Sequence, residues 1–520
     1  MIEHAAFPVE PWCVRESRLD LDLLAQSESL FALSNGHIGL RGNLDEGEPY
    51  GIPGTYLNSF YEVRPLPYAE AAYGYPESGQ TVVNVTNGKL IRLLVDDAPF
   101  DVRYGQLLGH ERVLDLRAGT LTRNAEWVSP AGRRVRVRST RLVSFTQRAV
   151  AAIEYVVEAV GGAVRLIAQS ELVANEPSPP RSGDPRVAAV LENALVALEQ
   201  DARDRGAQLL HRTRVSGLLI AAGMDHLVEA PGQVSTETRT MEDWARATFV
   251  CTLERGQQLR IVKLLAYGWS SLRSSSALRD QVAAALTGAR HTGFEDLVAE
   301  QRAYLDEFWD GADVRVEGDP EMQQAVRFGL FQVLQAGGRA ERRCLPAKGL
   351  TGPGYDGHTF WDAEAYVLPV LTYTQPQAAA DALRWRHSTL DLAKERAATL
   401  GLRGAAFPWR TIRGQECSGY WPAGTAAFHI NADIAAAVTS YLSVTGDETL
   451  EVEVGLELLV ETARLWMSLG HHDADGVWHI AGVTGPDEYT ANDGKGRSTA
   501  RAAARDSCRG MPRSPTPAAG

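Results

Sequence analysis

Trp361 and Asp362 place a large aromatic ring directly beside a carboxylate, inside a glycine-rich segment that spans residues 347–364. The indole of Trp361 can cover the apolar face of a pyranose, while Asp362 can accept hydrogen bonds from two sugar hydroxyls. The segment is not a phosphate-binding P-loop, because no Gly-Lys-Ser/Thr ends it. Taken alone, the pair is explained more simply by core packing of Trp361 at a helix start, with Asp362 as a first-turn acid.

A second loop, residues 407–422, mixes large aromatic side chains with Arg413 and Glu416. Guanidinium and carboxylate groups bind vicinal hydroxyls with directional hydrogen bonds, and rings such as that of Trp409 supply flat apolar area. The mixture is typical of polyol recognition. An ordinary packed loop with an Arg–Glu surface pair, which contributes little to stability, explains the same residues equally well.

A third loop, residues 482–489, places Asp487 and Glu488 on a rigid Gly-Pro turn. Cleavage of a glycosidic bond needs a carboxylic acid that is still protonated near neutral pH, which requires an apolar or like-charged neighbourhood. Glu488 beside Asp487 can meet that requirement. An acidic turn without any catalytic role is the commoner origin of such a pair, so this loop alone predicts little.

The elements that must position these loops differ between the two halves of the chain. Residues 1–270 are predicted to be mainly β, because segments such as 90–95 and 133–138 alternate or carry β-branched residues between turns. Residues 175–186 are rich in Pro and Ser and are predicted as an exposed loop inside that domain. From Ser275 to Trp309, apolar residues at three- and four-residue spacings predict a helical linker.

Helices are predicted to dominate beyond this linker, with five candidates between residues 320 and 470. One begins near Pro320, and another fills residues 376–400 and stops at Gly401. Asp447 is predicted to cap a third. The remaining candidates are the apolar segments 360–373 and 428–444. Long loops join these helices, and such loops commonly carry binding groups.

Composition narrows the classes of function. The length of 520 residues exceeds one ordinary domain, and a net charge of −13 disfavours binding to nucleic acid or to an anionic membrane surface. No stretch approaches the ~20 apolar residues of a spanning helix, and no basic segment followed by an apolar run begins the chain. We therefore expect a cytoplasmic enzyme. Its five cysteines never show a C-x-x-C spacing, which indicates neither a disulfide framework nor a zinc site.

Taken together the three loops are specific, and with two further motifs they resemble glycoside hydrolase family 65, which contains maltose, trehalose and kojibiose phosphorylases and some trehalose hydrolases. The resemblance covers about residues 1–490 and is carried by Phe-Ala-Leu-Ser-Asn-Gly-His-Ile-Gly-Leu-Arg-Gly (31–42), Gly-His-Thr-Phe-Trp-Asp (357–362), Phe-Pro-Trp (407–409), Phe-His-Ile-Asn-Ala-Asp-Ile (428–434) and Gly-Pro-Asp-Glu-Tyr (485–489). It implies a multidomain α+β fold with an N-terminal β-sandwich (1–270), a helical linker (271–319) and the first part of an (α/α)6-barrel (320–490).

The same resemblance implies that Glu488 is the general acid and that Trp361 and Asp362 hold a glucose at the nonreducing subsite. Together with the loop chemistry, it gives four further candidate substrate-binding residues, which are His358, Trp409, Arg413 and Glu416. The expected partners are a disaccharide and inorganic phosphate as co-substrate, and the family suggests a homodimer. No metal, no organic cofactor, no nucleic acid and no membrane are expected.

The implied reaction is inverting phosphorolysis of an α-linked glucose disaccharide, trehalose first and maltose or kojibiose next, to β-glucose 1-phosphate and glucose. A phosphorylase needs no second carboxylate because phosphate is already anionic, whereas an inverting hydrolase needs one about 6.5–9.5 Å from the acid. Asp362, Glu364 and Glu416 are candidates for that second acid. A trehalose-type hydrolase, or a catalytically dead fragment that at most binds sugar, are the alternatives.

Two features depart from the family pattern. Gln415 stands where a glutamate is expected. Residues 491–520 contain no Val, Ile, Leu, Phe, Tyr or Trp but six Lys or Arg, which predicts a disordered, non-native tail after a frameshift or premature stop. A closed barrel needs more helices than the five candidates, and phosphorolysis needs a site that positions phosphate. For both reasons we expect little or no phosphorolysis by the truncated chain.

Overall fold

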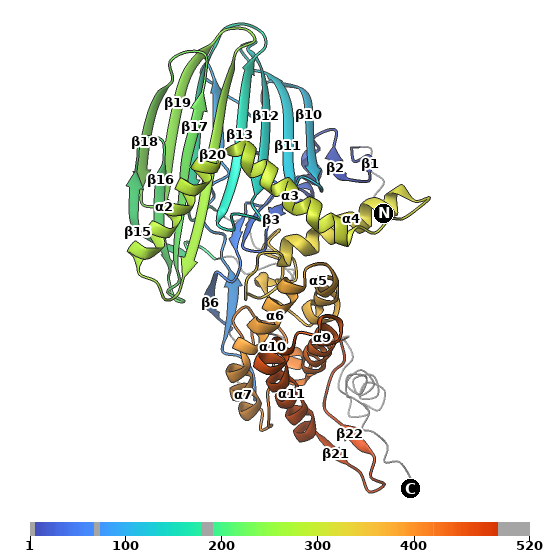
Figure 1. Ribbon diagram of the computed structural model, residues 1–520. Coiled ribbons are helices and arrows are strands. Elements are labelled where there is room, and N and C mark those ends of the chain that lie inside the picture. The colour runs from blue at the N-terminus through green and yellow to red at the C-terminus, as the bar shows by residue number, and fades with distance from the viewer. Residues whose placement is uncertain (1–5, 67–72, 178–190, 420, 487–520) are drawn as a thin grey trace. The chain divides into compact units, whose positions relative to one another are not determined.

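The structure, a computed structural model, describes residues 6–66, 73–177, 191–419 and 421–486 (Figure 1). The chain divides into two compact units. Unit 1 consists of Met1–Glu62, Val82–Arg339 and Lys348–Gly357, and unit 2 consists of Val63–Thr81, Ala340–Ala347 and His358–Gly520. The predicted site residues that the structure describes all fall in unit 2.

The larger sheet of unit 1 has ten strands in the order β1-β2-β10-β11-β12-β13-β20-β17-β16-β15. They are β1 Val9–Glu10, β2 Cys13–Glu16, β10 Gln106–Asp115, β11 Thr120–Val128, β12 Arg134–Val143, β13 Val150–Ala159, β15 Leu195–Ala202, β16 Ala207–Thr213, β17 Leu219–Glu229 and β20 Gln258–Ser270. Each strand is antiparallel to its neighbours. The alternation in β12 explains its conformation, because Val135 and Val137 are fully buried while the arginines beside them are exposed.

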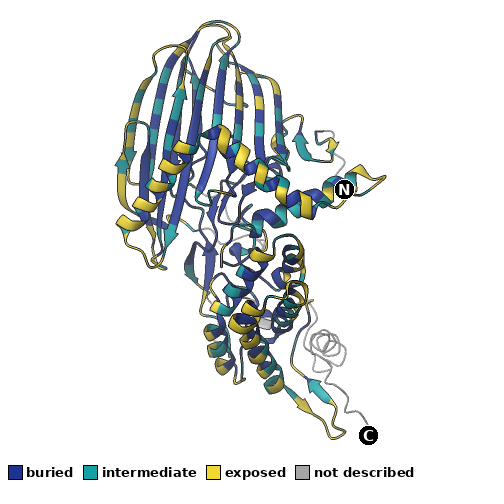
Figure 2. Cartoon of the chain, in the orientation of Figure 1, coloured by how far each residue is buried: buried dark blue, intermediate teal, exposed yellow. Residues whose placement is uncertain are grey.

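A second sheet of unit 1 has five strands in the order β18-β19-β14-β8-β9. They are β8 Ile91–Val95, β9 Ala98–Pro99, β14 Val164–Val173, β18 Ser235–Met241 and β19 Trp244–Leu253. Residues of β19 contact β16 and β20 of the larger sheet, and Figure 2 shows long buried stretches in the strands of this unit. The prediction of a large sheet domain in the first half of the chain is confirmed.

Smaller elements complete the N-terminal part of the chain. β3 Leu33–Ser34, β4 Ile38–Leu40 and β5 Thr55–Leu57 form a three-stranded sheet, and β6 Tyr61–Pro65 pairs with β7 Ser78–Val82. Short helices are η1 Leu21–Leu23, α1 Leu24–Leu30 and η2 Gly354–Gly357. The β6–β7 arm matters for the site, because its residues 63–81 belong to unit 2.

The predicted helical linker forms two helices that pack on the larger sheet. These are α2 Ser275–Thr292 and α3 Phe294–Ala312. In α2, Val282 and Leu286 are buried in one core cluster with residues of β17 and β20. Gly223 of β17 permits this approach, because an added Cβ would lie 2.8 Å from Leu286 and 2.9 Å from Val282. Both helices are therefore part of unit 1.

The next helix, α4 Pro320–Gly337, begins where the sequence predicts. The Asp319 side chain accepts a hydrogen bond from the Met322 amide at 2.9 Å, and Pro320 occupies the first turn, where it costs no helical hydrogen bond. This helix also belongs to unit 1, so the boundary between the units follows Arg339.

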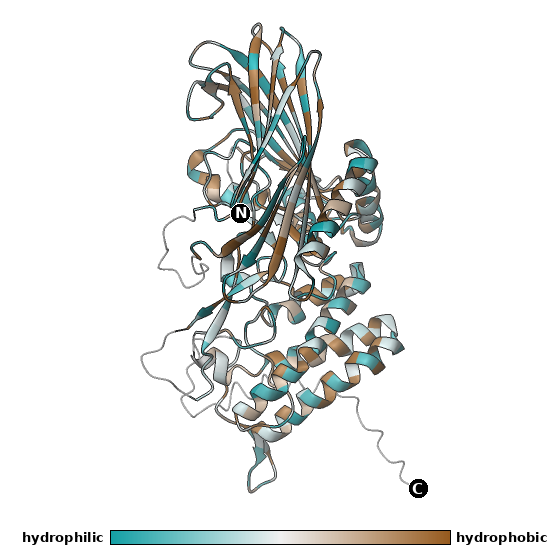
Figure 3. Ribbon diagram, turned by 90° about the vertical axis from the view of Figure 1, so that its left-hand side faces the viewer, coloured by the Kyte–Doolittle hydropathy of each residue, from teal (hydrophilic) through white to brown (hydrophobic). Residues whose placement is uncertain are grey.

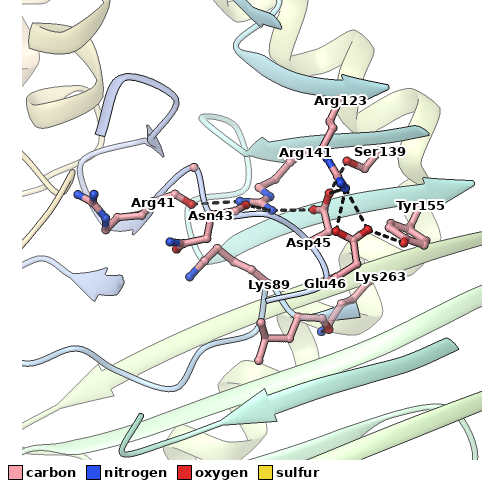
Figure 4. A network of polar contacts seen from close by, with 12 residues as sticks. Arg41, Asn43, Asp45, Glu46, Lys89, Arg123, Ser139, Arg141, Tyr155 and Lys263 are labelled. Carbon is pink, nitrogen blue, oxygen red and sulfur yellow. Dashed lines mark hydrogen bonds and ion pairs between the residues drawn. The ribbon is translucent and has the colours of Figure 1, made fainter. Parts of the chain in front are cut away.

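A network of buried charged residues lies inside unit 1 (Figure 4). Arg141 donates to Asp45 at 2.7 Å, and Arg123 donates to both carboxylate oxygens of Glu46 at 2.9 Å. The Tyr155 hydroxyl donates to Glu46 at 2.7 Å. Each of these buried carboxylates is thus paired with a cation, which offsets the cost of removing it from water.

Two lysines beside this network, Lys89 and Lys263, are fully buried but donate to neutral oxygens (Figure 4). The Lys89 ammonium donates to the Gly54 carbonyl and to the Thr55 hydroxyl, both at 2.8 Å. The Lys263 ammonium donates to two backbone carbonyls. Burial lowers the pKa of Lys89 to about 7 and holds the pKa of Lys263 well below its usual value.

We expect the stability of unit 1 to rise with pH because of Lys89. Its pKa is about 7 in the folded chain and ~10.4 in an unfolded chain. Between these values the unfolded chain holds a proton that the folded chain has released. The free energy of unfolding should therefore increase by up to about 1.4 kcal/mol per pH unit in this window. Below the window the folded chain carries a charged, buried amine, and the destabilisation by Lys89 is largest there.

Urea unfolding at several pH values across this window measures that slope. In Lys89→Met, whose side chain is uncharged and of similar length, the free energy of unfolding should depend less on pH. An identical pH dependence in the variant and the parent would rule Lys89 out as the source.

The described part of unit 2 is mainly helical. Its helices are η3 Ala363–Val367, α5 Leu368–Thr374, α6 Pro376–Ser388, α7 Leu390–Thr399, α8 Trp421–Ala426, α9 Ile430–Thr445, α10 Glu448–Leu450, η4 Glu451–Gly455 and α11 Leu456–Leu469, followed by the hairpin β21 Gly470–His472 and β22 Trp478–Ile480. Figure 3 shows hydrophobic and hydrophilic residues alternating around these helices, as amphipathic packing requires. A helical second half is confirmed, while its closure into a barrel stays a prediction.

The sequence predicts one helix over residues 376–400, and this prediction is wrong at Thr389. α6 ends at Ser388 and α7 begins at Leu390, with Thr389 at φ −101° and ψ 4° between them. The Thr389 hydroxyl donates to the Arg386 carbonyl at 2.8 Å, so it competes with the helical backbone. The apolar positions expected from the spacing are all buried, namely Ala379, Leu383, Leu390, Ala393 and Ala397.

The predicted cap at Asp447 is confirmed, because its side chain accepts a hydrogen bond from the Leu450 amide at 2.9 Å. Among the helices that the structure describes, none is long and apolar enough to cross a membrane. Residues 178–186 of the predicted exposed loop and the whole predicted tail, 491–520, lie outside the described residues.

Candidate functional site

Backbone hydrogen bonds join the first two predicted loops. Thr359 and Thr411 form an isolated antiparallel bridge, with N–O distances of 2.9 and 3.2 Å. The Phe407 amide donates to the side-chain oxygen of Asn431 at 2.9 Å, which ties the second loop to the start of α9. Segments that are well separated in sequence are therefore brought together within unit 2.

Gln80, in the β6–β7 arm, holds the second loop from far away in the sequence. Its Oε1 accepts hydrogen bonds from the Ile412 and Arg413 amides at 3.0 and 2.9 Å. Its Nε2 donates to Oε1 of Gln415 at 2.8 Å. Gln415, which departs from the family pattern, thus has a defined partner, and a glutamate at this position could accept the same hydrogen bond.

His358 is 1% exposed and has both ring nitrogens engaged. Its Nε2 donates to the Gln80 carbonyl at 2.5 Å, and its Nδ1 accepts from the Arg410 guanidinium at 2.5 Å. Burial, together with the nearby Arg410 charge, holds the pKa of His358 well below its usual value. A neutral His358 therefore supports the two loops, and its predicted contact with substrate stays a prediction.

Trp361, Trp409 and His429 form one aromatic cluster. The His429 ring meets Trp361 at a centroid distance of 5.2 Å and Trp409 at 5.1 Å, in both cases edge-on. Trp361 is half-buried, whereas Trp409 is only 4% exposed. Trp361 thus has ring surface exposed to solvent, while Trp409 has little. That Trp409 itself binds substrate stays a prediction.

His429 is a candidate that the loop chemistry does not identify. It is the residue before α9, and its Nδ1 lies 3.1 Å from an oxygen of Asp433, one helical turn further on. Its Nε2 is buried without a hydrogen-bond partner among the described residues. A buried nitrogen of this kind is one that a bound hydroxyl can satisfy.

Asp362 lies at the start of η3 and is exposed. Its side chain makes no capping hydrogen bond to the helix, so helix capping does not account for it. An available carboxylate directly follows a half-buried indole, as the sugar-binding interpretation requires. Arg413 is also exposed, and its backbone is fixed through Gln80.

Glu364 forms a buried ion pair with Arg386 of α6. Its Oε1 accepts from Nε of Arg386 at 2.8 Å and from Nη2 at 2.5 Å, and both residues are at most 5% exposed. Burial raises the pKa of Glu364, although the Arg386 charge opposes the shift. Oε1 of this carboxylate is therefore committed to a protein partner, while Oε2 is buried without a hydrogen-bond partner among the described residues.

Glu416 is 5% exposed, and its carboxylate accepts hydrogen bonds from three backbone amides. Oε2 accepts from the Trp409 amide at 2.6 Å, and Oε1 accepts from the Cys417 and Ser418 amides at 3.0 and 2.8 Å. Burial raises its pKa against the effect of these bonds. Glu416 thus holds the backbone of the second loop through these hydrogen bonds. Its predicted contact with substrate stays a prediction.

The described part of the third loop contacts α8, which follows the second loop. The Thr484 amide donates to the Ala426 carbonyl at 3.0 Å, shortly before Phe428. The predicted general acid, Glu488, lies outside the described residues, which end at Pro486. Within the described ranges, no group of three or more His, Cys, Asp or Glu side chains is arranged to hold a metal ion.

Sequence reasoning overlooks three features of this site. Gln80 carries no local signal, because its partners are more than 270 positions away. The Glu364–Arg386 pair also depends on tertiary packing. His429 and Asp433 are the exception, since their four-residue spacing on a predicted helix could have indicated the contact.

Comparisons with known proteins identify the family of the chain. Residues 14–308 match the family model described as "Glycosyl hydrolase family 65, N-terminal domain", and residues 327–505 match "Glycosyl hydrolase family 65 central catalytic domain". An uncharacterized glycosyl hydrolase of Mycobacterium tuberculosis is 72% identical over 94% of this chain and 62% of its own length. The chain thus spans less than two thirds of that relative.

More distant relatives have named activities. The α,α-trehalose phosphorylase of Thermoanaerobacter brockii is 37% identical over 93% of this chain and 64% of its own length. The maltose phosphorylase of Bacillus subtilis is 28% identical over 95% of this chain and 64% of its own. A solved structure assigned as a kojibiose phosphorylase from the human microbiome is 25% identical, with a TM-score of 0.86 over 94% of this chain and 63% of that one.

Proposed function

Because the chain belongs to glycosyl hydrolase family 65, we propose that its site serves inverting phosphorolysis of an α-linked glucose disaccharide, trehalose first and maltose or kojibiose next. One observation carries the proposal, namely that the exposed Asp362 carboxylate directly follows Trp361, whose ring is anchored by His429. The order of substrates is supported by the trehalose phosphorylase at 37% identity, against 28% for the maltose enzyme.

In the proposed reaction the Trp361 ring covers one face of the nonreducing glucose, and Asp362 accepts hydrogen bonds from its hydroxyls. Glu488 donates its proton to the interglycosidic oxygen as the bond to the anomeric carbon breaks. An oxygen of inorganic phosphate forms the new bond from the opposite face, which gives β-glucose 1-phosphate and releases the second glucose. Phosphate is the co-substrate, and the reaction requires no metal or organic cofactor.

The described carboxylates support a phosphorylase over a hydrolase. An inverting hydrolase needs a second carboxylate that is free to activate water. Of the three candidates, Glu364 is 5% exposed and ion-paired to Arg386 through Oε1, and Glu416 is bound by three backbone amides. Only Asp362 of these three is exposed, and it is assigned to the sugar.

The test combines an activity assay with a binding measurement on the chain of residues 1–520. Trehalose, maltose, kojibiose and nigerose are each incubated with and without phosphate, and glucose and glucose 1-phosphate are quantified. Phosphate-dependent cleavage supports the proposal, and cleavage without phosphate supports the trehalose-type hydrolase. If neither occurs, the catalytically dead fragment is the remaining alternative. Calorimetric titration with glucose and trehalose then measures whether that fragment binds sugar.

We expect Trp361→Ala to weaken sugar binding by about tenfold, because the ring supplies flat apolar contact area. The matched control is Tyr373→Ala, which removes an aromatic ring that is 73% exposed on α5. Sugar affinity that is the same in parent, Trp361→Ala and Tyr373→Ala would remove Trp361 from the site.

A further inference from the structure

Unit 1 contains a pocket of about 260 Å³ that lies between the turn joining β15 to β16 and the second half of α2. The turn contributes Arg203 and Arg205, and α2 contributes Arg290. Since one water molecule accounts for about 30 Å³ of the liquid, the pocket has room for a ligand larger than a single inorganic anion. Two carboxylates, those of Asp204 and Asp225, line the same space, so the guanidinium groups outnumber the carboxylates by one. The excess positive charge favours a negatively charged ligand.

Arg205 is the arginine of this group with the weakest partner. Arg203 pairs with Asp201 at 3.0 Å, and Arg290 pairs with Asp225 at 2.8 Å. Arg205 lies 3.9 Å from the carboxylate of Asp204, and the Asp204 side chain is 89% exposed. The Nε atom of Arg205 is buried and has no hydrogen-bond partner among the described residues. Its charge is thus available to an anion in the pocket.

Gln208 supplies a second, independent indication of a ligand. The residue is 5% exposed and lines this pocket as well as a smaller one of about 30 Å³ beside Arg279. Its Nε2 donates to the Arg279 carbonyl at 3.3 Å, while its Oε1 is buried without a hydrogen-bond partner among the described residues. An amide oxygen in this state can accept a hydrogen bond from a hydroxyl group, and inorganic phosphate near neutral pH offers few such donors.

The rest of the wall is partly polar, with Asp204, Asp225 and Thr287, and partly apolar. Met224 of β17 is 1% exposed, and Leu286 of α2 is 7% exposed. Aliphatic side chains of this kind pack against the C–H face of a sugar ring, while the hydroxyls turn toward the polar wall. The pocket therefore combines a cationic end, a hydroxyl acceptor and an apolar surface.

We propose that this pocket binds a phosphorylated sugar, with the phosphate on Arg205, a sugar hydroxyl on Oε1 of Gln208 and the ring against Met224 and Leu286. The proposal stands on unit 1 alone and does not depend on the reaction proposed for unit 2. It assigns to the sheet domain a ligand site of its own.

The test is calorimetric titration of the chain of residues 1–520 with glucose 6-phosphate, inorganic phosphate and glucose. We expect glucose 6-phosphate to bind more tightly than either of the other two. Arg205→Gln should weaken it by about tenfold or more, because a charge-assisted hydrogen bond is lost. Arg205→Lys keeps the positive charge but not the planar guanidinium. Its affinity for glucose 6-phosphate should lie between those of the parent and Arg205→Gln.

Two controls keep the outcome specific. Arg302→Gln removes a partly exposed arginine of α3 that does not line the pocket, and it should leave the affinity unchanged. Trp361→Ala should also leave it unchanged, which separates this site from the one proposed in unit 2. The inference is overturned if no binding is measured, if Arg205→Gln binds as the parent does, or if inorganic phosphate binds as tightly as glucose 6-phosphate.

Discussion

Replacing Arg386 with methionine is expected to lower the free energy of unfolding of unit 2 by about 3–5 kcal/mol. The guanidinium of Arg386 donates two hydrogen bonds to Oε1 of Glu364, and both side chains are buried. Without Arg386, the Glu364 carboxylate stays buried and uncompensated. Urea unfolding followed by tryptophan fluorescence measures the change.

This destabilisation should itself depend on pH. Burial already raises the pKa of Glu364, and loss of the opposing cation raises it further. In the window between the unfolded pKa of ~4.3 and the raised folded pKa, the folded variant holds a proton that the unfolded chain has lost. Its stability therefore falls as pH rises through this window, and the gap to the parent narrows toward acidic pH.

Two further variants show whether the buried charge is the cause. Arg384→Met changes another arginine of the same helix. Arg384 is partly exposed, and its carboxylate partner Asp381 lies at 3.5 Å, so this substitution should lower the free energy of unfolding by less than about 1 kcal/mol. Arg386→Met combined with Glu364→Met removes both charges and should recover much of the lost stability. A double variant no more stable than Arg386→Met alone would falsify the charge-burial explanation.

Glu416→Ala is expected to lower the free energy of unfolding by about 2 kcal/mol or more, because it removes a buried acceptor shared by three backbone amides. Those amides belong to Trp409, Cys417 and Ser418, and the Cys417 amide also donates to the Arg410 carbonyl at 3.1 Å. Hydrogen exchange should accelerate at these three positions, and sugar affinity should fall because the loop that holds Trp409 loosens. Exchange measured by mass spectrometry on peptides from residues 405–419 follows the loop directly.

The neighbouring residue provides the comparison. Gln415→Ala removes an exposed side chain whose recorded side-chain partner is the amide of Gln80, and it should cost about 1 kcal/mol or less. If Glu416→Ala and Gln415→Ala have equal effects on stability and on exchange, the carboxylate of Glu416 does not organise the loop.

The order of secondary structure was largely predictable from the sequence, because local patterns specify it. The alternation of residues 134–138 gives a strand, and Asp319 before Pro320 gives a helix start. The break at Thr389 was not predictable from apolar spacing, since the spacing continues through it. There a side-chain hydrogen bond to the Arg386 carbonyl decides the conformation.

The sequence by itself determined the family, and it indicated the three loops of the proposed site with the pair of Trp361 and Asp362. Tertiary structure alone decided which polar residues are free to act. The polar side-chain atoms of His358 and Glu416 form hydrogen bonds inside the protein, whereas the side chain of Asp362 is exposed. The physical reason is that a buried polar group must find a partner, and the partner that fixes the second loop, Gln80, comes from a distant arm of the chain that local sequence patterns do not reveal.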